Sequence, residues 1–202
     1  VTTFSAGELA RGETLFQDLG ISSESRVVCY GAAAASYYQM LNVRDHPVDK
    51  SVDQHSYLPD EVTLRSGLTR GVADDTVIIR MGRELAPLAV SEAPRIVDYA
   101  SRANDLDDLL LACRSSFMVA GGATGIWWLA AMFNRPVLLT DCYSLSHSTY
   151  GPQDRFLPLL AVDAHTQTFL PLAWIIAHPE WAREVSVLAR VRIRHCSAVE
   201  IA

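Results

Sequence analysis

The stretch SFMVAGGATG, residues Ser116–Gly125, decides the fold that the sequence predicts. Its first half is apolar and reads as a short buried strand, Ser116–Ala120. The glycine-rich half, Gly121–Gly125, predicts a turn. A helix over Ile126–Phe133 and a further strand over Pro136–Thr140 (PVLLT) follow it. The stretch therefore predicts a strand–turn–helix–strand unit of the kind found in parallel sheets.

The same stretch is the strongest candidate for binding chemistry. Small residues let an anion approach the backbone, Thr124 can donate a hydrogen bond, and N–H groups at a helix start favour negative charge. In the alternative interpretation the glycines only turn the chain. The stretch is neither a P-loop, since no Gly-Lys-Ser/Thr follows, nor the G-x-G-x-x-G fingerprint.

Further strands and helices alternate outward from this stretch. Together they predict an α/β fold, a parallel sheet with helices on both faces. A helix is also possible over 32–40, a polar loop covers 44–56, another loop follows Asp141, and His178 can open a helix. The apolar pieces 156–162 and 168–177 are of uncertain type. The strands are expected over 26–30, 76–81 and 95–100, and the helices over 5–19, 59–69 and 105–113.

Ligands bind such sheets at the carboxyl ends of the strands, which selects the candidate site residues. Arg80 closes an apolar strand, so it either clamps a phosphate or forms a salt bridge. The residues at these strand ends are Gly31, Arg80, Met81, Gly82, Tyr99, Gly121, Gly122, Ala123, Thr124, Gly125 and Asp141.

Composition excludes several classes of function. The 202 residues suit one domain, and the net charge of −6 argues against binding nucleic acid. No apolar run reaches the roughly 20 residues of a transmembrane helix. The four cysteines, Cys29, Cys113, Cys142 and Cys196, match no zinc motif. They are expected to be buried, reduced thiols of a cytosolic protein, with a catalytic cysteine as the alternative.

The histidines and paired tryptophans carry weaker signals. No two of the six histidines lie four residues apart, so the sequence predicts no helical metal pair. His55 and His147 lie in polar loops and are acid–base candidates or, alternatively, solvated loop residues. Trp127 and Trp128 are expected to be core residues rather than a platform for stacking a base.

Taken in order, these pieces resemble a family of bacterial glycosyltransferases of the GT-B type. The resemblance spans the whole chain in short matches. The stretch 120–141 is also similar to the donor half of heptosyltransferase-like enzymes. The matching segments are Arg26–Tyr30, His55–Tyr57, Val77–Gly82, Pro87–Leu88, Ile96–Ala100, Ser116–Asp141 and the tail Ser197–Ala202.

The resemblance implies one Rossmann-like, nucleotide-sugar-binding domain over residues 1–202. The capping-box start at Ser197 indicates that the chain is part of a longer protein. The resemblance leaves room for an acceptor domain on the N-terminal side, outside this chain. Gly122–Gly125 would contact the diphosphate of the donor, Arg80, Met81 and Gly82 would lie beside it, and Tyr99 would lie near the base or ribose. No metal or other cofactor is implied, and the catalytic base stays unassigned. The implied location is cytoplasmic, with peripheral association with the inner membrane left open.

Departures from the family pattern keep other functions open. The run Gly31–Ala35 stands where relatives carry a His or Arg-Asp cluster, and Leu58–Asp60 replaces Arg-Asn-Asp. The leading hypothesis is a glycosyltransferase that moves a sugar from a nucleotide sugar to a hydroxyl acceptor. The alternatives are a non-catalytic binding or scaffold domain that has lost these charges, and an unrelated nucleotide-binding enzyme such as a sugar epimerase.

Overall fold

The core of the molecule is a six-stranded sheet in which every neighbouring pair of strands is parallel. The strand order is β3-β2-β1-β4-β5-β6, so the predicted α/β, Rossmann-like sheet is confirmed. The computed structural model describes residues 3–32, 59–82, 87–88, 95–100, 104–122, 124–142, 151–178, 181 and 190–202. The strands are β1 (Arg26–Ala32), β2 (Thr76–Arg80), β3 (Ile96–Asp98), β4 (Phe117–Gly121), β5 (Val137–Cys142) and β6 (Arg155–Pro158).

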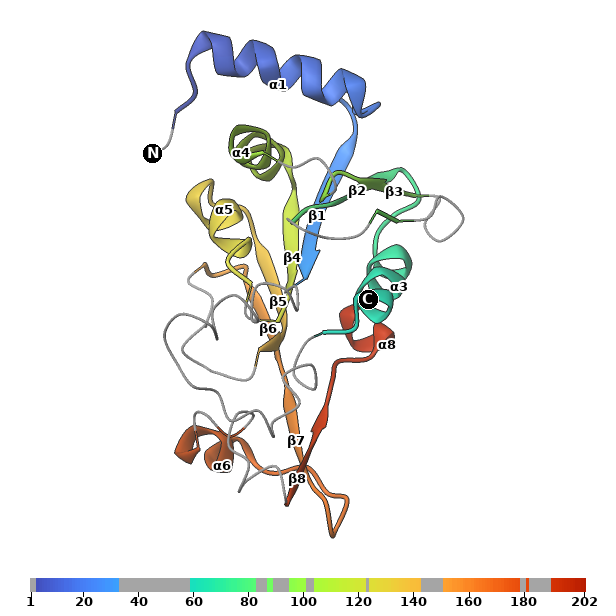
Figure 1. The fold of residues 1–202 in the computed structure, drawn as a ribbon, viewed down its shortest axis with the longest axis vertical. Coiled ribbons are helices and arrows are strands. Elements are labelled where there is room, and N and C mark those ends of the chain that lie inside the picture. The colour runs from blue at the N-terminus through green and yellow to red at the C-terminus, as the bar shows by residue number, and fades with distance from the viewer. Residues whose placement is uncertain are drawn as a thin grey trace.

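Helices cover both faces of this sheet, as predicted (Figure 1). One face carries α1 (Ala6–Asp18), α4 (Asp105–Arg114) and α5 (Trp127–Met132), and the other carries α3 (Glu61–Gly71) and α8 (Ala198–Ile201). Alternate residues of β1 supply both cores: Val27 and Cys29 belong to one apolar cluster, Val28 and Tyr30 to the other. A strand buried on both faces has to be apolar throughout, which is why β1 shows no polar alternation.

Four of the helices begin at a residue whose side chain caps the first turn. The Ser5 side chain accepts a hydrogen bond from the Glu8 N–H, while the Glu8 carboxylate accepts one from the Ser5 N–H, which forms a capping box. Ser197 and Glu200 repeat this arrangement at α8. Asp60 caps α3 and Asn104 caps α4 through their side-chain oxygens. No helix within the described ranges has the length and apolar character needed to cross a membrane.

The last helix packs closely on α3. A Cβ placed on Gly67 of α3 would lie only 2.6 Å from the Cβ of Ile201, so α8 depends on a residue without a side chain at this contact. The packing brings the segment before α8 to the end of β5, where the Cys196 N–H donates to the Asp141 carboxylate over 2.8 Å. The end of the chain is thereby part of the carboxyl edge of the sheet.

A small antiparallel unit extends from this edge (Figure 1). It consists of β7 (Leu160–Asp163), β8 (Val191–Arg194) and the short helix α6 (Leu172–Ala177). Only Leu159 separates β6 from β7 along the chain. The unit has its own apolar cluster, in which Trp181 is fully buried. Figure 1 shows it at the opposite end of the molecule from α1.

Several element boundaries differ from the sequence predictions. Strand β5 runs through Asp141 to Cys142, two residues beyond the predicted end at Thr140. Helix α5 has only six residues, because its first turn from Gly125 is a tighter one. The apolar pieces of uncertain type form β6, β7 and α6. The possible helix over 32–40 and the loop over 44–56 fall almost entirely outside the described residues, and His178 ends α6.

Candidate functional site

The centre of the carboxyl edge lies between β1 and β4. From β1 the chain proceeds outward to β2 and β3, then returns to β4 and proceeds the other way. The two strands pair in register, with Gly31 opposite Ala120 and Ala32 opposite Gly121. In doubly wound sheets this reversal leaves a crevice at the strand ends, where ligands bind. The glycine-rich turn begins at this place.

The turn combines a required glycine with an open backbone position. Gly122 has φ of 71°, a conformation that disfavours side chains, and its N–H donates to the Thr140 carbonyl of β5 over 2.7 Å. The Thr124 N–H donates to the Gly122 carbonyl over 2.9 Å. Gly125 is exposed, and a Cβ placed on it would meet nothing within 4 Å. The predicted contact of Ala123 lies outside the described residues. The turn thus presents an accessible backbone at Gly125.

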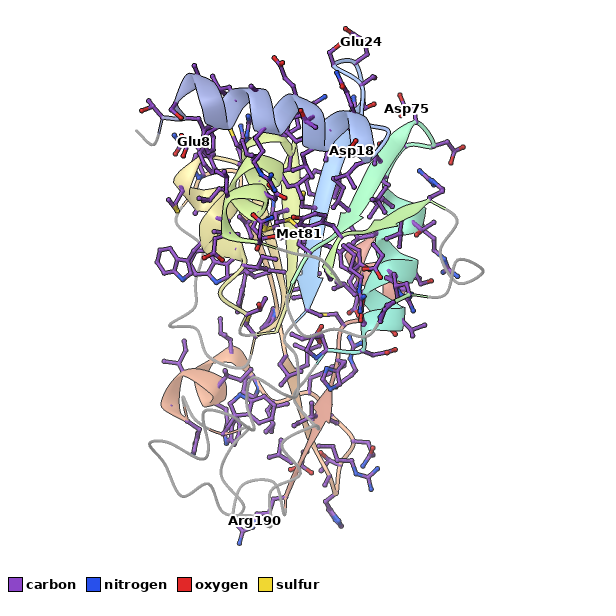
Figure 2. The ribbon with its side chains drawn as sticks, turned by 45° about the horizontal axis from the view of Figure 1, so that its top comes forward. Glu8, Asp18, Glu24, Asp75, Met81 and Arg190 are labelled. Atoms are coloured by element: carbon purple, nitrogen blue, oxygen red, sulfur yellow. The ribbon has the colours of Figure 1, made fainter. Side chains whose placement is uncertain are left out.

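Two other candidate glycines serve close packing. A Cβ on Gly31 would lie 2.9 Å from the Ile126 side chain and 3.2 Å from the Met81 carbonyl oxygen. A Cβ on Gly121 would lie 3.1 Å from the Leu64 side chain of α3. Met81 is fully buried, and Figure 2 shows it in the middle of the molecule. These residues bring β1, β2 and the start of α5 together at the predicted edge.

Arg80 lies at this edge but is occupied by carboxylates. Its Nε and Nη2 donate to the two oxygens of Glu61 over 2.6 and 3.0 Å, and its Nη1 donates to Asp98 over 3.1 Å. Only 3% of the Arg80 side chain is exposed. The remaining Asp98 oxygen accepts the Leu88 N–H over 2.8 Å, and the Tyr30 hydroxyl donates to Glu61 over 3.3 Å. Arg80 therefore forms ion pairs inside the protein. The sequence leaves two possibilities open for it, a phosphate clamp or a salt bridge at the surface.

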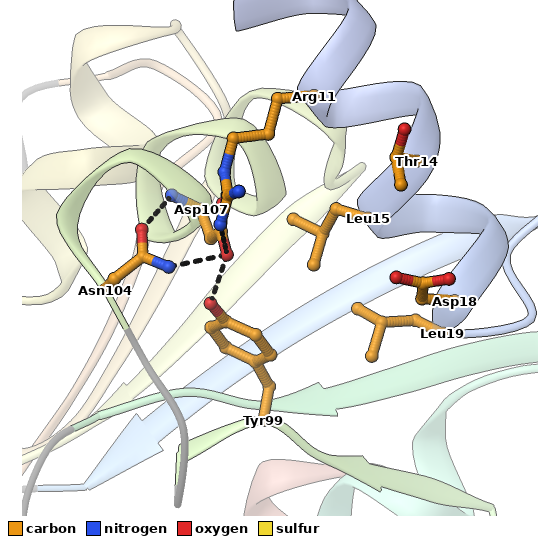
Figure 3. Close-up of a pocket in the computed structure, with 8 residues that line it drawn as sticks. All are labelled: Arg11, Thr14, Leu15, Asp18, Leu19, Tyr99, Asn104 and Asp107. Atoms are coloured by element: carbon orange, nitrogen blue, oxygen red, sulfur yellow. Dashed lines mark hydrogen bonds and ion pairs between the residues drawn. The ribbon is translucent and has the colours of Figure 1, made fainter.

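Gly82 and Tyr99 follow β2 and β3. Gly82 has φ of 133° and is half-buried. Tyr99 is buried, and its hydroxyl donates to Asp107 over 2.8 Å (Figure 3). Arg11 and Asn104 bind the same carboxylate. These groups border a cavity of about 430 Å³ between α1 and the start of α4. Its lining residues are Arg11, Thr14, Leu15, Asp18, Leu19, Tyr99, Asn104 and Asp107.

The hydrogen bonds around Asp107 affect its ionisation. Burial opposes the charged form, but the donors Arg11, Tyr99 and Asn104 outweigh it and lower the pKa of the Asp107 carboxyl. Burial and the bond to Asp107 raise the pKa of Tyr99. The phenol therefore stays a neutral donor that is directed at α4. Its contact with a base or ribose remains a prediction.

Asp141 is held in an unusual backbone conformation at the end of β5. Its φ is 55°, and it is 3% exposed. One carboxylate oxygen accepts the Cys196 N–H and lies 3.2 Å from Nδ1 of His195. Gly122 and Asp141 belong to neighbouring strand ends, because Gly122 binds Thr140. The sequence analysis did not select His195, since nothing local indicates a contact with a residue 54 positions earlier.

The cysteines differ in burial, and burial affects their ionisation. Cys29, Cys142 and Cys196 are buried, which confirms the expected burial, and Cys113 is half-buried. Burial, followed by the charge of Asp141, raises the pKa of both Cys142 and Cys196 to about 12. These thiols are therefore protonated at neutral pH and weak nucleophiles. Among the described residues, no three His, Cys, Asp or Glu side chains are grouped to hold a metal ion.

One hydroxyl near the site makes a testable contribution to stability. Thr140 is fully buried, and its hydroxyl has no hydrogen-bond partner within the described ranges. Thr140→Val is expected to leave the free energy of unfolding unchanged or to raise it by up to about 1 kcal/mol, because valine has the same shape without the unpaired group. Urea denaturation measures this. Thr69→Val, which removes a 2.8 Å bond to the Arg65 carbonyl, is the destabilised control. A clear loss of stability in Thr140→Val would contradict the prediction.

Comparisons with known proteins give two similar solved structures. No family model and no curated protein sequence matches the chain. The ADP-heptose LPS heptosyltransferase II of E. coli is 16% identical, with a TM-score of 0.45, over 78% of this chain and 44% of that one. A family 9 glycosyltransferase from Veillonella parvula is 9% identical, with a TM-score of 0.48, over 78% and 41%. The chain thus spans less than half the length of either glycosyltransferase.

Proposed function

We propose that this chain binds a nucleotide sugar and forms the donor half of a glycosyltransferase. The observation that carries the proposal is the turn at the reversal point of the sheet, where Gly122 has a left-handed backbone and Gly125 leaves an open approach. The sequence resemblance supports the same class of activity. The acceptor would be a hydroxyl compound. Residues outside this chain, on its N-terminal side, would bind it.

The turn is assigned the diphosphate. During transfer, the acceptor oxygen bonds to the anomeric carbon while the bond from that carbon to the diphosphate oxygen breaks. The acceptor hydroxyl loses its proton, and the nucleoside diphosphate leaves with the electron pair. The exposed backbone at Gly125 and the Thr124 hydroxyl would stabilise the charge that develops on this leaving group. Arg80 is not assigned this task, because Glu61 and Asp98 bind its guanidinium.

The test is calorimetric binding of uridine, guanosine, cytidine and adenosine diphosphates and their common sugar derivatives. One of these is expected to bind, and Gly125→Ala is expected to weaken it by at least about tenfold, since a methyl group blocks approach to the backbone. The protein itself has room for this methyl group. Gly7→Ala, on α1, is the matched control, because a Cβ there also meets nothing within 4 Å. The control is expected to bind as the unaltered protein does.

Three outcomes would count against the proposal. Binding that Gly125→Ala leaves unchanged would place the nucleotide elsewhere. Absence of binding for the whole panel, with the circular dichroism of a folded protein, would favour the non-catalytic alternative. One observation already favours that alternative: the cation at the end of β2 is paired with Glu61 and Asp98 inside the protein. A nucleotide that binds at the turn without sugar release in the presence of acceptors would also support a binding domain.

A further inference from the structure

One of the four tryptophans is exposed next to the glycine-rich turn. Trp127 and Trp181 are buried and Trp174 is half-buried, but 51% of Trp128 is accessible. The sequence prediction that both Trp127 and Trp128 are core residues is therefore right for Trp127 and wrong for Trp128. Burial of an indole is strongly favourable, so a ligand ring that covers Trp128 would gain affinity from the contact.

Trp128 lies shortly after the turn in the chain. It is the second residue of α5, and its N–H donates to the Gly125 carbonyl over 3.1 Å. Helical side chains lean toward the N-terminus and cover the preceding turn of backbone. The preceding backbone here is Thr124–Gly125, which is the place assigned to the diphosphate. A ring attached to that diphosphate would lie within reach of the indole.

The indole of Trp128 is supported from one side. The rings of Trp127 and Trp128 stack with their centroids 4.1 Å apart and their planes 22° apart. Trp127 is only 3% exposed and belongs to the core, so it gives Trp128 a fixed base. A preorganised aromatic surface loses little side-chain freedom when a ligand ring stacks on it.

We propose that Trp128 is the ring-stacking residue of the donor site, and this inference rests on the proposed function. The flat face of an indole suits a nucleobase, and it equally suits the C–H face of a sugar ring. Either ring of a nucleotide sugar therefore has the required chemistry. Trp128 would contribute affinity and select the ring that follows the diphosphate, while the turn binds the phosphates.

The test compares three variants by calorimetry with the nucleotide that binds best in the panel. Trp128→Ala is expected to raise its Kd by about 5- to 100-fold, the usual size of one lost stacking contact. Trp128→Phe is expected to retain most of the affinity. Met132→Ala, one turn further along α5 and 49% exposed, is the matched control and is expected to bind normally. All three substitutions are at exposed positions, so circular dichroism is expected to show a folded protein.

Comparing nucleoside diphosphates with nucleotide sugars identifies the stacked ring. An equal loss of affinity for both in Trp128→Ala means that the base stacks, and a loss confined to the nucleotide sugar means that the sugar stacks. If Gly125→Ala weakens binding but Trp128→Ala does not, the stacking role is wrong and the proposed function stands. If no nucleotide binds, both fail. Equal weakening by Met132→Ala, with concentration-dependent self-association in sedimentation, would overturn stacking in favour of a contact between copies of the chain.

Discussion

Arg80→Ala is expected to lower the free energy of unfolding by about 3 kcal/mol, near the lower end of the range for breaking a buried ion pair. The substitution leaves Glu61 and Asp98 facing each other without the guanidinium that binds both. Their side chains are 25% and 17% exposed, so water reaches them and the loss stays below the maximum. The same change also removes the side chain through which β2 is bonded to both β3 and α3.

Urea denaturation of the variant and of Arg80→Lys measures this effect. Lysine keeps the charge but cannot donate to both Glu61 oxygens at once, so roughly half of the loss is expected for Arg80→Lys. Arg155→Ala, an exposed arginine on β6, is the control and is expected to change stability by less than about 0.5 kcal/mol. If Arg80→Ala is as stable as this control, the network around Arg80 does not hold the edge of the sheet together.

Asp107→Ala is expected to reduce the free energy of unfolding by about 2–3 kcal/mol, since a buried charged acceptor with several donors is lost. Its carboxylate binds Arg11 through both oxygens and also accepts hydrogen bonds from Tyr99 and Asn104 (Figure 3). Arg11 is half exposed and water can solvate it, but the Tyr99 hydroxyl is left buried. Adding Tyr99→Phe to Asp107→Ala is therefore expected to cost less than Tyr99→Phe alone, by about 1 kcal/mol. Additive losses in this double-mutant cycle would contradict the network.

The pH dependence of stability follows from the lowered pKa of Asp107. A carboxyl whose folded pKa is lower than its unfolded value stabilises the protein above the unfolded value and loses this contribution as pH falls through the folded pKa. The stability difference between the protein and Asp107→Asn is expected to be full above about pH 5. It is expected to shrink as the pH falls below the ordinary carboxyl value of about 3.9. A difference that stays constant through this range would show that ionised Asp107 is not the stabilising form.

Local patterns in the sequence predict the elements well because their causes are local. The apolar run of β4 ends at a glycine pair, and the N-caps Ser5, Asp60 and Ser197 act on backbone groups two or three residues away. The same rule fails at Asp141. Asp141 has a positive φ inside the strand, and β5 continues past it because Cys142 pairs with Pro158 of β6, a contact that local sequence does not indicate.

In the candidate site too, the positions of residues at strand ends were predictable from the sequence, and their contacts were not. The strand-end rule collected Gly31, Met81, Gly121 and Gly122 at one edge, because parallel strands all end there. The strand-end rule does not predict the partners of Arg80. These are Asp98, its register neighbour on β3, and Glu61, the first residue of α3. Nor could periodicity tell which indole of the Trp127–Trp128 pair is buried, since a six-residue helix is too short to define an apolar face.

The sequence by itself determined the α/β class, the parallel sheet and the glycine-rich turn, since these depend on apolar runs, helix caps and glycines. The tertiary structure alone decided what each polar group meets. Arg80 binds carboxylates, Tyr99 faces Asp107, Asp141 holds the segment before α8, and Trp128 stays at the surface. The physical reason is that hydrogen bonds and ion pairs act over about 3 Å, whichever parts of the chain the packing of helices and strands brings that close.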